Sequence, residues 1–455
     1  MEMILEFLRD VLSQPALLIG IMSCVGLIAL KRPFHKIMTG TLKPILGYLM
    51  LAAGAGVIVS NLDPLGKMIE HGFHITGVVP NNEAIVAVAQ KVLGVETMSI
   101  LVVGLLMNLL IARFTKFKYV FLTGHHSLFM ACLMSAVLGT VGLSGIELIL
   151  LGGFLMGAWS AISPAIGQSY TSKVTDGDEI ALGHFGSLGY YLSAWVAKYV
   201  GKAEESTEDI EIPEKWGFGR DSTLSTALTM IVFYLIAAIA AGSEFVATLS
   251  DSMSPYLFAV MSAMNFSVGV AIVYSGVRMI LGDLIPAFQG IATKIIPNAI
   301  PAVDCAVFFT YAPTAVVLGF ISSFIGGIIG MLILGAIGGV LIIPGLVPHF
   351  FCGATAGIYG NATGGRRGAA VGAFINGLAI TFLPALALPV LGQLGFQNTT
   401  FGDADFAVMG LVLGNAFEWI GMAGIYGVVV IAALVLFIPN FIKTKGKVIN
   451  YVEEE

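Results

Sequence analysis

The sequence predicts an all-α integral membrane protein, and three observations support this fold class. Apolar residues make up 57% of the 455 residues, and charged residues make up only 11%. The mean hydropathy is +0.92, whereas soluble domains carry about 25% charged residues, so a soluble fold could not bury this apolar surface. The apolar runs are continuous rather than alternating, which favours helices of roughly 20 residues over a β-barrel.

About eleven transmembrane helices are expected in a single domain that covers residues 1–455, although the long runs 305–352 and 370–440 can be divided differently. The expected spans are residues 15–30, 45–61, 98–113, 119–141, 146–167, 224–243, 255–281, 305–335, 337–352, 370–395 and 408–440. Four stretches rich in glycine, proline and polar groups are expected to be re-entrant or broken helices. They are residues 54–66, 174–192, 282–304 and 353–369.

Basic residues predict the orientation of this multi-pass protein in the cell inner (plasma) membrane. They follow the first span at Lys31, Arg32, Lys36 and Lys43 and the last span at Lys443, Lys445 and Lys447. Basic flanks lie on the cytoplasmic side. This predicts an outside N-terminus, a cytoplasmic C-terminus and an odd number of spans. Residues 1–14 have one basic residue and no cleavage site after them, so no cleaved signal is expected.

Residues 198–223 are the one long polar stretch and are expected to form a solvated cytoplasmic loop or, alternatively, a docking surface. With no soluble catalytic domain expected, any chemistry has to occur in the membrane or on a partner. The net charge of −6 and the lack of a basic cluster argue against a nucleic-acid partner. The four cysteines lie singly in apolar runs and are expected to be inert buried thiols.

The chain contains a weak internal repeat, with a first half at about 15–200 and a second at about 224–440. The paired landmarks are Gly56-Val57 with Gly276-Val277, His125 with Asp304, Pro164 with Pro344, and Gly183-His184 with Gly360-Asn361. Weak repeats are common in transporters, whose substrate lies at the interface between the two halves. Chance similarity in a glycine-rich apolar chain is the alternative.

Four ionisable residues inside apolar runs are candidate functional residues: His125, His126, His184 and Asp304. Such residues are costly in a membrane and mark functional sites by default. His125 and His126 are adjacent, about 100° apart on a helix, so at most one of them can point straight at a given cavity. A purely structural pair between Asp304 and a histidine is the alternative.

Other polar residues receive weaker assignments. Asp283 could pair with Arg278, and Glu418 could face the protein interior. The run Gly364-Gly365-Arg366-Arg367 lacks the lysine and hydroxyl residue of a P-loop, which favours a cytoplasmic anchor. The sequence shows no catalytic triad, dinucleotide motif or metal-ligand spacing, so no catalytic residue, cofactor or metal is expected.

Six stretches give the chain a resemblance to a known family. They are FLTGHH at 121–126, VTDG…GH at 174–184, GKAEESTEDIEIP at 201–213, GVRM…AFQGI at 276–291, AVDCA…YAPTAVV at 302–317 and LIIPG at 341–345. In this order, over nearly the whole chain, they resemble the membrane-embedded IIC component of the L-ascorbate phosphotransferase system.

The resemblance implies eleven spans in two inverted repeats, with a V-shaped scaffold part and a core part. It also implies a homodimer formed through the scaffold, an elevator-type movement of the core, and a separate IIB protein that docks on the cytoplasmic side and phosphorylates the substrate. The implied ligand site comprises Gly54, Ala55, His125, Phe129, His184, Phe185 and Asp304.

The chain departs from the family at two of these positions, because Phe129 and Phe185 stand where the family has glutamine. Either other groups such as Ser127 and Ser187 replace the two amides, or the ligand differs. The first hypothesis is a IIC transporter for L-ascorbate or a related sugar-like molecule, with phosphoryl transfer by partner proteins. The second is a proton- or sodium-coupled carrier with Asp304 and the histidines as a relay. The third and weakest is a membrane enzyme.

Overall fold

The computed structural model describes residues 11, 14–74, 77–80, 82–177, 180–210, 222–250, 253–392 and 399–441. The C-terminal lysines used to predict the orientation and residues 211–221 of the expected polar loop lie outside these ranges. Within them the protein is an all-α membrane protein. Seven of the described helices are long and apolar enough to cross a membrane, or eight if one bent pair counts as a span. This count does not confirm the expected eleven spans.

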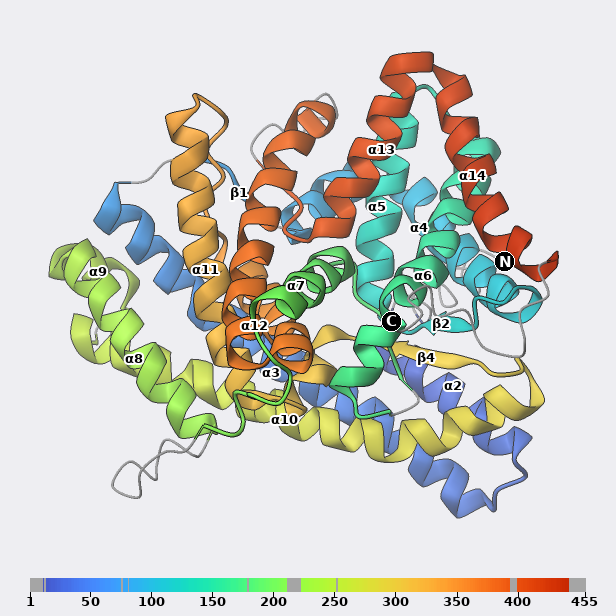
Figure 1. The fold of residues 1–455 in the computed structure, drawn as a ribbon, viewed down its shortest axis with the longest axis horizontal. Helices are drawn as coiled ribbons and strands as arrows, with labels where there is room; N and C mark the ends of the chain where they lie inside the picture. Colours follow the sequence, from blue (N-terminus) through green and yellow to red (C-terminus); the bar gives the residue numbers. More distant parts are fainter. Residues whose placement is uncertain are drawn as a thin grey trace.

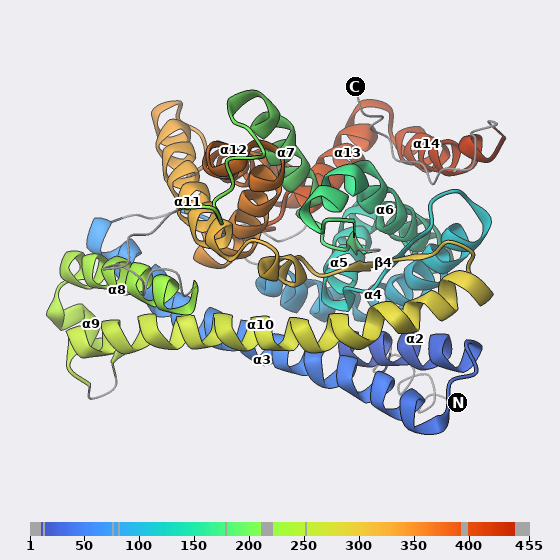
Figure 2. The same cartoon turned by 60° about the horizontal axis from the view of Figure 1, so that its bottom comes forward.

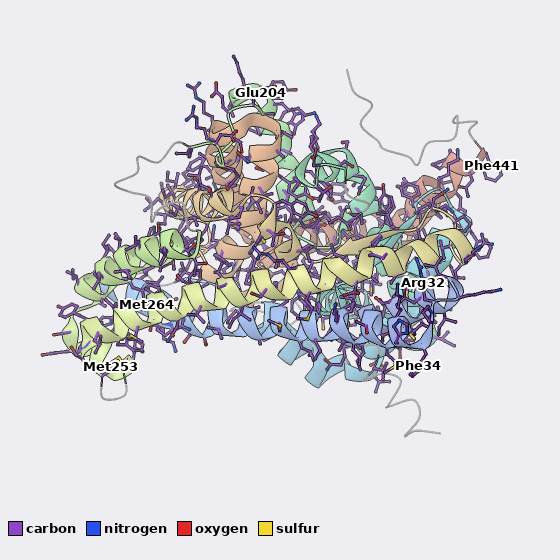
Figure 3. The ribbon with its side chains drawn as sticks, turned by 90° about the horizontal axis from the view of Figure 1, so that it is seen from below. Arg32, Phe34, Glu204, Met253, Met264 and Phe441 are labelled. Carbon is purple, nitrogen blue, oxygen red and sulfur yellow. The ribbon has the colours of Figure 1, made fainter. Side chains whose placement is uncertain are left out.

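Two long helices form the base of the structure. Helices α3 (Phe34–Phe73) and α10 (Pro255–Lys294) lie side by side and antiparallel along its length (Figure 2). Packed beside them are α2 (Pro15–Ala29), α8 (Ser222–Ala241) and α9 (Ser243–Leu249). Figure 3 places Arg32 and Phe34 at one end of this base layer, and Met253 and Met264 at the other.

Two glycines on each long helix explain why α3 and α10 pack so closely. A Cβ atom on Gly47 would lie 2.8 Å from the carbonyl oxygen of Gly276, and one on Gly54 would lie 2.7 Å from that of Gly269. These distances leave no room for a side chain, so the two backbones are in direct contact. The two glycines are equally spaced on both helices, which makes the crossing symmetrical.

The same two helices show that two predicted breaks are wrong. α3 continues across residues 54–66 in spite of Pro64, and α10 continues through Pro286 as far as Lys294. A proline inside a helix costs roughly 3 kcal/mol, because it removes a hydrogen bond and crowds the preceding turn. The packing of each long helix along its whole length offsets that cost. Of the predicted broken stretch 282–304, only residues 295–304 lie outside the helix.

The remaining long helices form a second, upper layer (Figures 1 and 2). They are α4 (Asn82–Phe114), α5 (Gly124–Thr140), α6 (Gly145–Val174), α7 (Ser187–Val200), α11 (Pro313–Ala336), α12 (Leu346–Gly392), α13 (Ala404–Ile420) and α14 (Met422–Phe441). Helices α4, α5 and α6 pack together, while α7 and α11 pack on α12. One buried apolar cluster joins the base layer to α11 and α12, and a second lies among α4, α5, α6 and α13.

Helix α12 is two antiparallel helices rather than one long rod. Its backbone is non-helical at Gly364 and at Gly365, where φ is 59°, a left-handed conformation that glycine adopts easily. The order of its contacts along α11 reverses at this point. The packing pairs are Gly327–His349 and Ala315–Gly357 before the break, and Ser323–Gly377 and Gly330–Thr381 after it. The predicted broken helix at 353–369 is therefore confirmed.

Two other predicted spans differ from the structure. Residues 337–352 are not a separate helix, because 337–345 are non-helical and α12 begins at Leu346. Residues 408–440 are two helices, α13 and α14, which part at Gly421 with a φ of 62°. In both cases the hydropathy is uniform, so it does not reveal where the backbone turns.

Short parallel strands connect the helices of the upper layer. The strand β4 (Ile300–Val303) lies between β2 (Tyr119–Phe121) and β3 (Ala181–Leu182), and β1 (Val79–Pro80) pairs with β5 (Thr399–Thr400). The predicted broken stretch 174–192 leaves the helix in its described residues between α6 and α7, where β3 lies, and is helical again from Ser187. Parallel strands end at the same edge of a sheet, so the residues that follow them meet. These residues are His125, His126, His184 and Asp304 in the first sheet and Asn82 and Asp403 in the second.

Candidate ligand-binding site

A cavity of about 1150 Å³ lies between the base layer and the upper layer. Most of its lining comes from apolar side chains of α3, α8, α11 and the first half of α12. One side, the polar wall, carries the hydrogen-bonding groups Tyr48, Asn82, His125, His126, His184, Asp304, Cys352 and Asp403. An apolar cavity with a few convergent polar groups is the usual form of a small-molecule site.

His125 and Asp304 form one half of the polar wall. The Nε2 atom of His125 lies 3.4 Å from Oδ2 of Asp304, and its Nδ1 atom lies 3.1 Å from the hydroxyl oxygen of Tyr48. Oδ1 of Asp304 accepts a hydrogen bond from the Ala306 amide and so caps the short helix η2 (Cys305–Thr310). Oδ2 has no hydrogen bond among the described residues. Oδ1 therefore holds the start of η2, whereas Oδ2 is buried beside the His125 ring, and the Asp304 side chain as a whole lines the cavity.

His126 and His184 form the other half, with ring centroids 3.7 Å apart. Nδ1 of His126 accepts a hydrogen bond from the Phe185 amide, and Nδ1 of His184 accepts one from the Gly186 amide. The Tyr190 hydroxyl also lies 2.9 Å from Nδ1 of His184. A neutral imidazole has one acceptor and one donor nitrogen. Both rings are therefore fixed with the hydrogen on Nε2, where each can donate to a ligand oxygen.

This hydrogen bonding disfavours a metal ion at the same place. His126, His184 and Asp403 have potential ligand atoms within 4.8 Å of one another. A metal needs a free lone pair on each nitrogen, but Nδ1 already accepts a backbone N–H and Nε2 carries the proton. For the same reason, the 3.8 Å approach of His184 Nδ1 to Asp403 Oδ1 is not a hydrogen bond.

Asp403 lies on the polar wall although the sequence analysis did not select it. Its Oδ2 atom accepts a hydrogen bond from the Asn82 side chain at 2.6 Å, and its Oδ1 atom accepts one from the Cys352 thiol at 2.9 Å. The Asn82 side chain also accepts a bond from the Gly402 amide. The pairing of β1 with β5 brings these segments together. Cys352 is buried, as predicted, and its thiol has a polar partner.

Asp405 holds the loop behind the polar wall in place. Its side chain is fully buried and accepts hydrogen bonds from the Leu188 amide, the Ser187 hydroxyl and the Trp159 indole. Its own amide donates to the carbonyl oxygen of Phe185. Asp405 thus joins the start of α13 to the start of α7, directly after the loop that carries His184. The acids of FGDADF lie between the spans expected at 370–395 and 408–440, so the search for ionisable residues inside apolar runs did not include them.

The structure places the residues implied by the family resemblance in two groups. On the cavity lining are Ala55, His125, Phe129, His184 and Asp304. Away from it, Gly54 lies in the contact between α3 and α10, and Phe185 is fully buried and stacked on Phe121.

The serines considered as replacements for the missing amides also point elsewhere. The Ser127 hydroxyl donates to the carbonyl oxygen of Thr123, and the Ser187 hydroxyl donates to Asp405. Both serines are fully buried behind the polar wall. Of the two departures from the family pattern, Phe129 is therefore the one that presents an apolar ring to the cavity.

Two predicted charge assignments are wrong. Asp283 forms its ion pair with Lys43 at 3.5 Å, not with Arg278. Glu418 is exposed at the end of α13 and does not face the protein interior.

Residues 201–210 of the polar stretch form a mostly exposed loop, as expected, and hydrogen bonds tie this loop to the upper layer. Its Glu208 carboxylate accepts hydrogen bonds from the amides of Thr314 and Ala315 at the start of α11. The carbonyl oxygen of Glu205 accepts one from the Arg366 amide at the turn of α12. Figure 3 shows Glu204 of this segment on the side of the molecule away from the long helices.

Comparison with known proteins agrees with the resemblance found in the sequence. A family model described as "PTS system sugar-specific permease component" matches residues 10–405. The protein named "Ascorbate-specific PTS system EIIC component" from Mycoplasma pneumoniae (strain ATCC 29342 / M129 / Subtype 1) is 26% identical over 474 aligned residues, which cover 90% of this chain and 70% of that protein. The chain therefore belongs to the sugar-specific permease components of the phosphotransferase system, which are membrane transport subunits and not themselves enzymes.

Proposed function

We propose that this chain is a IIC component that binds L-ascorbate or a closely related sugar-like molecule and moves it inward across the membrane. A separate IIB protein would transfer the phosphoryl group to the substrate, because the chain itself offers no phosphoryl-transfer motif. The observation that carries the proposal is the polar wall, where carboxylate acceptors and Nε2 donors face one cavity. The match to a relative named as ascorbate-specific supports the choice of substrate.

The ligand would be held between the two halves of the polar wall. Asp304 would accept a ligand hydroxyl through its carboxylate, while His184 would donate from Nε2. His125 is 39% exposed and would close the same side of the site. Ala55 and Phe129 would contact the apolar face of the ring. Gly54 and Phe185 would act indirectly, through the helix crossing and the packing behind the histidines.

The symmetrical crossing of α3 and α10 supports two inverted repeats within one domain of eleven spans. In this arrangement the base layer is the scaffold through which two copies associate, and the upper layer is the core that moves like an elevator. The cavity at the contact between the two layers is where such a movement would carry the ligand. The basic residues that follow α2 support an outside N-terminus and a cytoplasmic C-terminus.

The alternative is a carrier driven by protons or sodium. The contact between His125 and Asp304 favours it, because an imidazole and a carboxylate at 3.4 Å can exchange a proton. Transport in sealed vesicles separates the two functions. Phosphoenolpyruvate and the soluble partner proteins would be required for a phosphotransferase component, whereas an ion gradient alone would drive the carrier.

The test of ligand class and site is calorimetric titration of the purified protein with L-ascorbate, hexoses and hexitols. Wild type is compared with Asp304→Asn and His184→Ala. We expect L-ascorbate to bind to the wild type, and its affinity to fall about tenfold or more in each variant. This is the usual cost of removing a hydrogen bond to a charged or buried group. Binding of a hexitol instead of L-ascorbate would refute the substrate, and unchanged binding in both variants would refute the site.

A further inference from the structure

The polar wall contains a second carboxylate that is buried as deeply as the first. Asp403 is 4% exposed and Asp304 is 7% exposed. A carboxylate offers about four acceptor positions, and among the described residues Asp403 receives one amide and one weak thiol donor. A buried charge with so few donors is unfavourable unless another donor completes it. Asp403 also lines the cavity.

The nearby imidazole of His184 cannot supply that donor. Nδ1 of His184 lies 3.8 Å from Oδ1 of Asp403, but it accepts hydrogen bonds from Gly186 and Tyr190 and has no proton to give. Asp405, two residues along the chain, contrasts with Asp403, because it receives three strong donors and does not line the cavity. The missing donor at Asp403 therefore has to come from the cavity.

Resting on the proposed function, we propose that Asp403 binds a hydroxyl group of the transported sugar-like molecule directly, as a second acceptor beside Asp304. The substrate then donates hydroxyl protons to two carboxylates and accepts hydrogen bonds from the two histidine rings between them. This geometry selects a polyhydroxylated molecule with hydroxyl groups on two separate edges. A ligand with one polar edge leaves one carboxylate without its donor, which costs affinity.

Asn82 and Cys352 are positioning residues for this carboxylate. Asn82 lies at the start of α4 and Cys352 lies on α12, so Asp403 at the start of α13 is held from two sides. The amide fixes Oδ2 and the thiol fixes Oδ1. An acceptor fixed in advance binds a hydroxyl without losing further conformational freedom. The contact depends on three segments that are far apart in the sequence.

The test is calorimetric titration of the full-length protein with L-ascorbate, 6-deoxy-L-ascorbate, D-isoascorbate and galactitol. Wild type is compared with Asp403→Asn and with Asp63→Asn. Asp63 is the matched control because it lines the same cavity on α3 but is 61% exposed and paired with Lys67. We expect Asp403→Asn to weaken the bound probe about tenfold or more, and Asp63→Asn to leave its affinity unchanged. Equal affinities in wild type and Asp403→Asn would overturn the proposal.

The analogues distinguish direct contact from a structural role. If Asp403 binds one hydroxyl, the analogue that lacks or inverts that hydroxyl loses affinity in the wild type but little further affinity in Asp403→Asn. An equal loss for every probe would mean that the wall is merely distorted, and the proposal would fall. If Asp403→Asn does not fold, Cys352→Ala takes its place, because it removes one of the hydrogen bonds that hold the Asp403 carboxylate. The proposal then requires Cys352→Ala to reduce the affinity that the same ligand hydroxyl contributes. A wild type that binds none of the probes would overturn the proposed function and this proposal together.

Discussion

The base layer and the polar wall border the same cavity but are built on opposite requirements. In the base layer, α3 and α10 touch through glycines, and the contact requires the absence of side chains. In the polar wall, the buried side chains are fixed by hydrogen bonds. Asp403 and His126 bond to residues of other segments, whereas Asp304 and His184 accept from amides two residues further along their own loops. The base layer therefore depends on the space available for side chains, and the polar wall depends on hydrogen-bond donors and acceptors.

The difference predicts which kind of substitution each region tolerates. Adding atoms should harm the base layer, whereas removing acceptors should harm the polar wall and the residues behind it. The base layer is held rigid where the backbones of α3 and α10 meet at glycines. The polar wall instead keeps its geometry, because its side chains are fixed from α4, α7, α12 and α13 together. This contrast fits a rigid binding site that moves against a rigid support.

The largest effect is expected for Asp405→Ala. The change leaves the Leu188 amide, the Trp159 indole and the Ser187 hydroxyl without their acceptor. Each buried donor left unpaired costs about 1–3 kcal/mol, so the free energy of unfolding should fall by about 3 kcal/mol or more. Thermal unfolding of the detergent-purified protein measures it. Asp405→Asn keeps one acceptor oxygen and should lose less; equal stability of both variants and wild type would contradict the assignment.

Gly54→Ala should cost about 1–3 kcal/mol, the usual range for overpacking. Its new Cβ atom would lie 2.7 Å from the carbonyl oxygen of Gly269 and 2.8 Å from the Val273 nitrogen. Gly56 is the matched control on the same helix, since a Cβ atom there would meet nothing within 4 Å. Gly56→Ala should be neutral or stabilising by up to about 1 kcal/mol. Melting temperatures in the opposite order would show that volume does not limit the crossing.

The broad fold was predictable because hydropathy records where lipid contacts the chain. The break at Gly364 and Gly365 was also predicted, because it lies in a stretch rich in glycine and polar groups. The turn at Gly421 was not, because this glycine differs from other glycines of the apolar run only in φ, which tertiary contacts determine. At Pro64 and Pro286 a break was predicted where the helix in fact continues, because long-range packing keeps it intact.

The site was predictable where a single ionisable residue, which is energetically unfavourable in a membrane, lies inside an apolar run. Asp304, His125 and His184 were found in this way and line the cavity. Asp403 was not predicted because it lies between two expected spans, and only the pairing of β5 with β1 brings it to the wall. Which atoms of the histidines donate was also beyond the sequence, since it depends on the Phe185 and Gly186 amides.

A smaller difference in ligand affinity is expected between two substitutions of His184, by glutamine and by alanine. A glutamine places an amide N–H near the position of Nε2, whereas alanine places none. We expect His184→Gln to retain several times more affinity for L-ascorbate than His184→Ala, since a neutral hydrogen bond contributes about 0.5–1.5 kcal/mol. Calorimetric titration of both variants measures the difference. Equal losses would mean that the ligand does not use the Nε2 donor, and the polar wall would then be specified by packing, like the base layer.

The smallest effect is expected for Glu208→Gln, at the outer surface of the upper layer. The carboxylate accepts from the amides of Thr314 and Ala315 at the start of α11, where a negative charge is favourable. A glutamine keeps one acceptor oxygen and loses the charge, so stability should fall by at most about 1 kcal/mol. Asp209→Asn is the control, since Asp209 is an exposed neighbour of the same charge. A loss as large as that of Asp405→Ala would show that residues 201–210 hold the upper layer together as firmly as the buried network does. The contrast between a replaceable surface contact and an irreplaceable buried one would then fail.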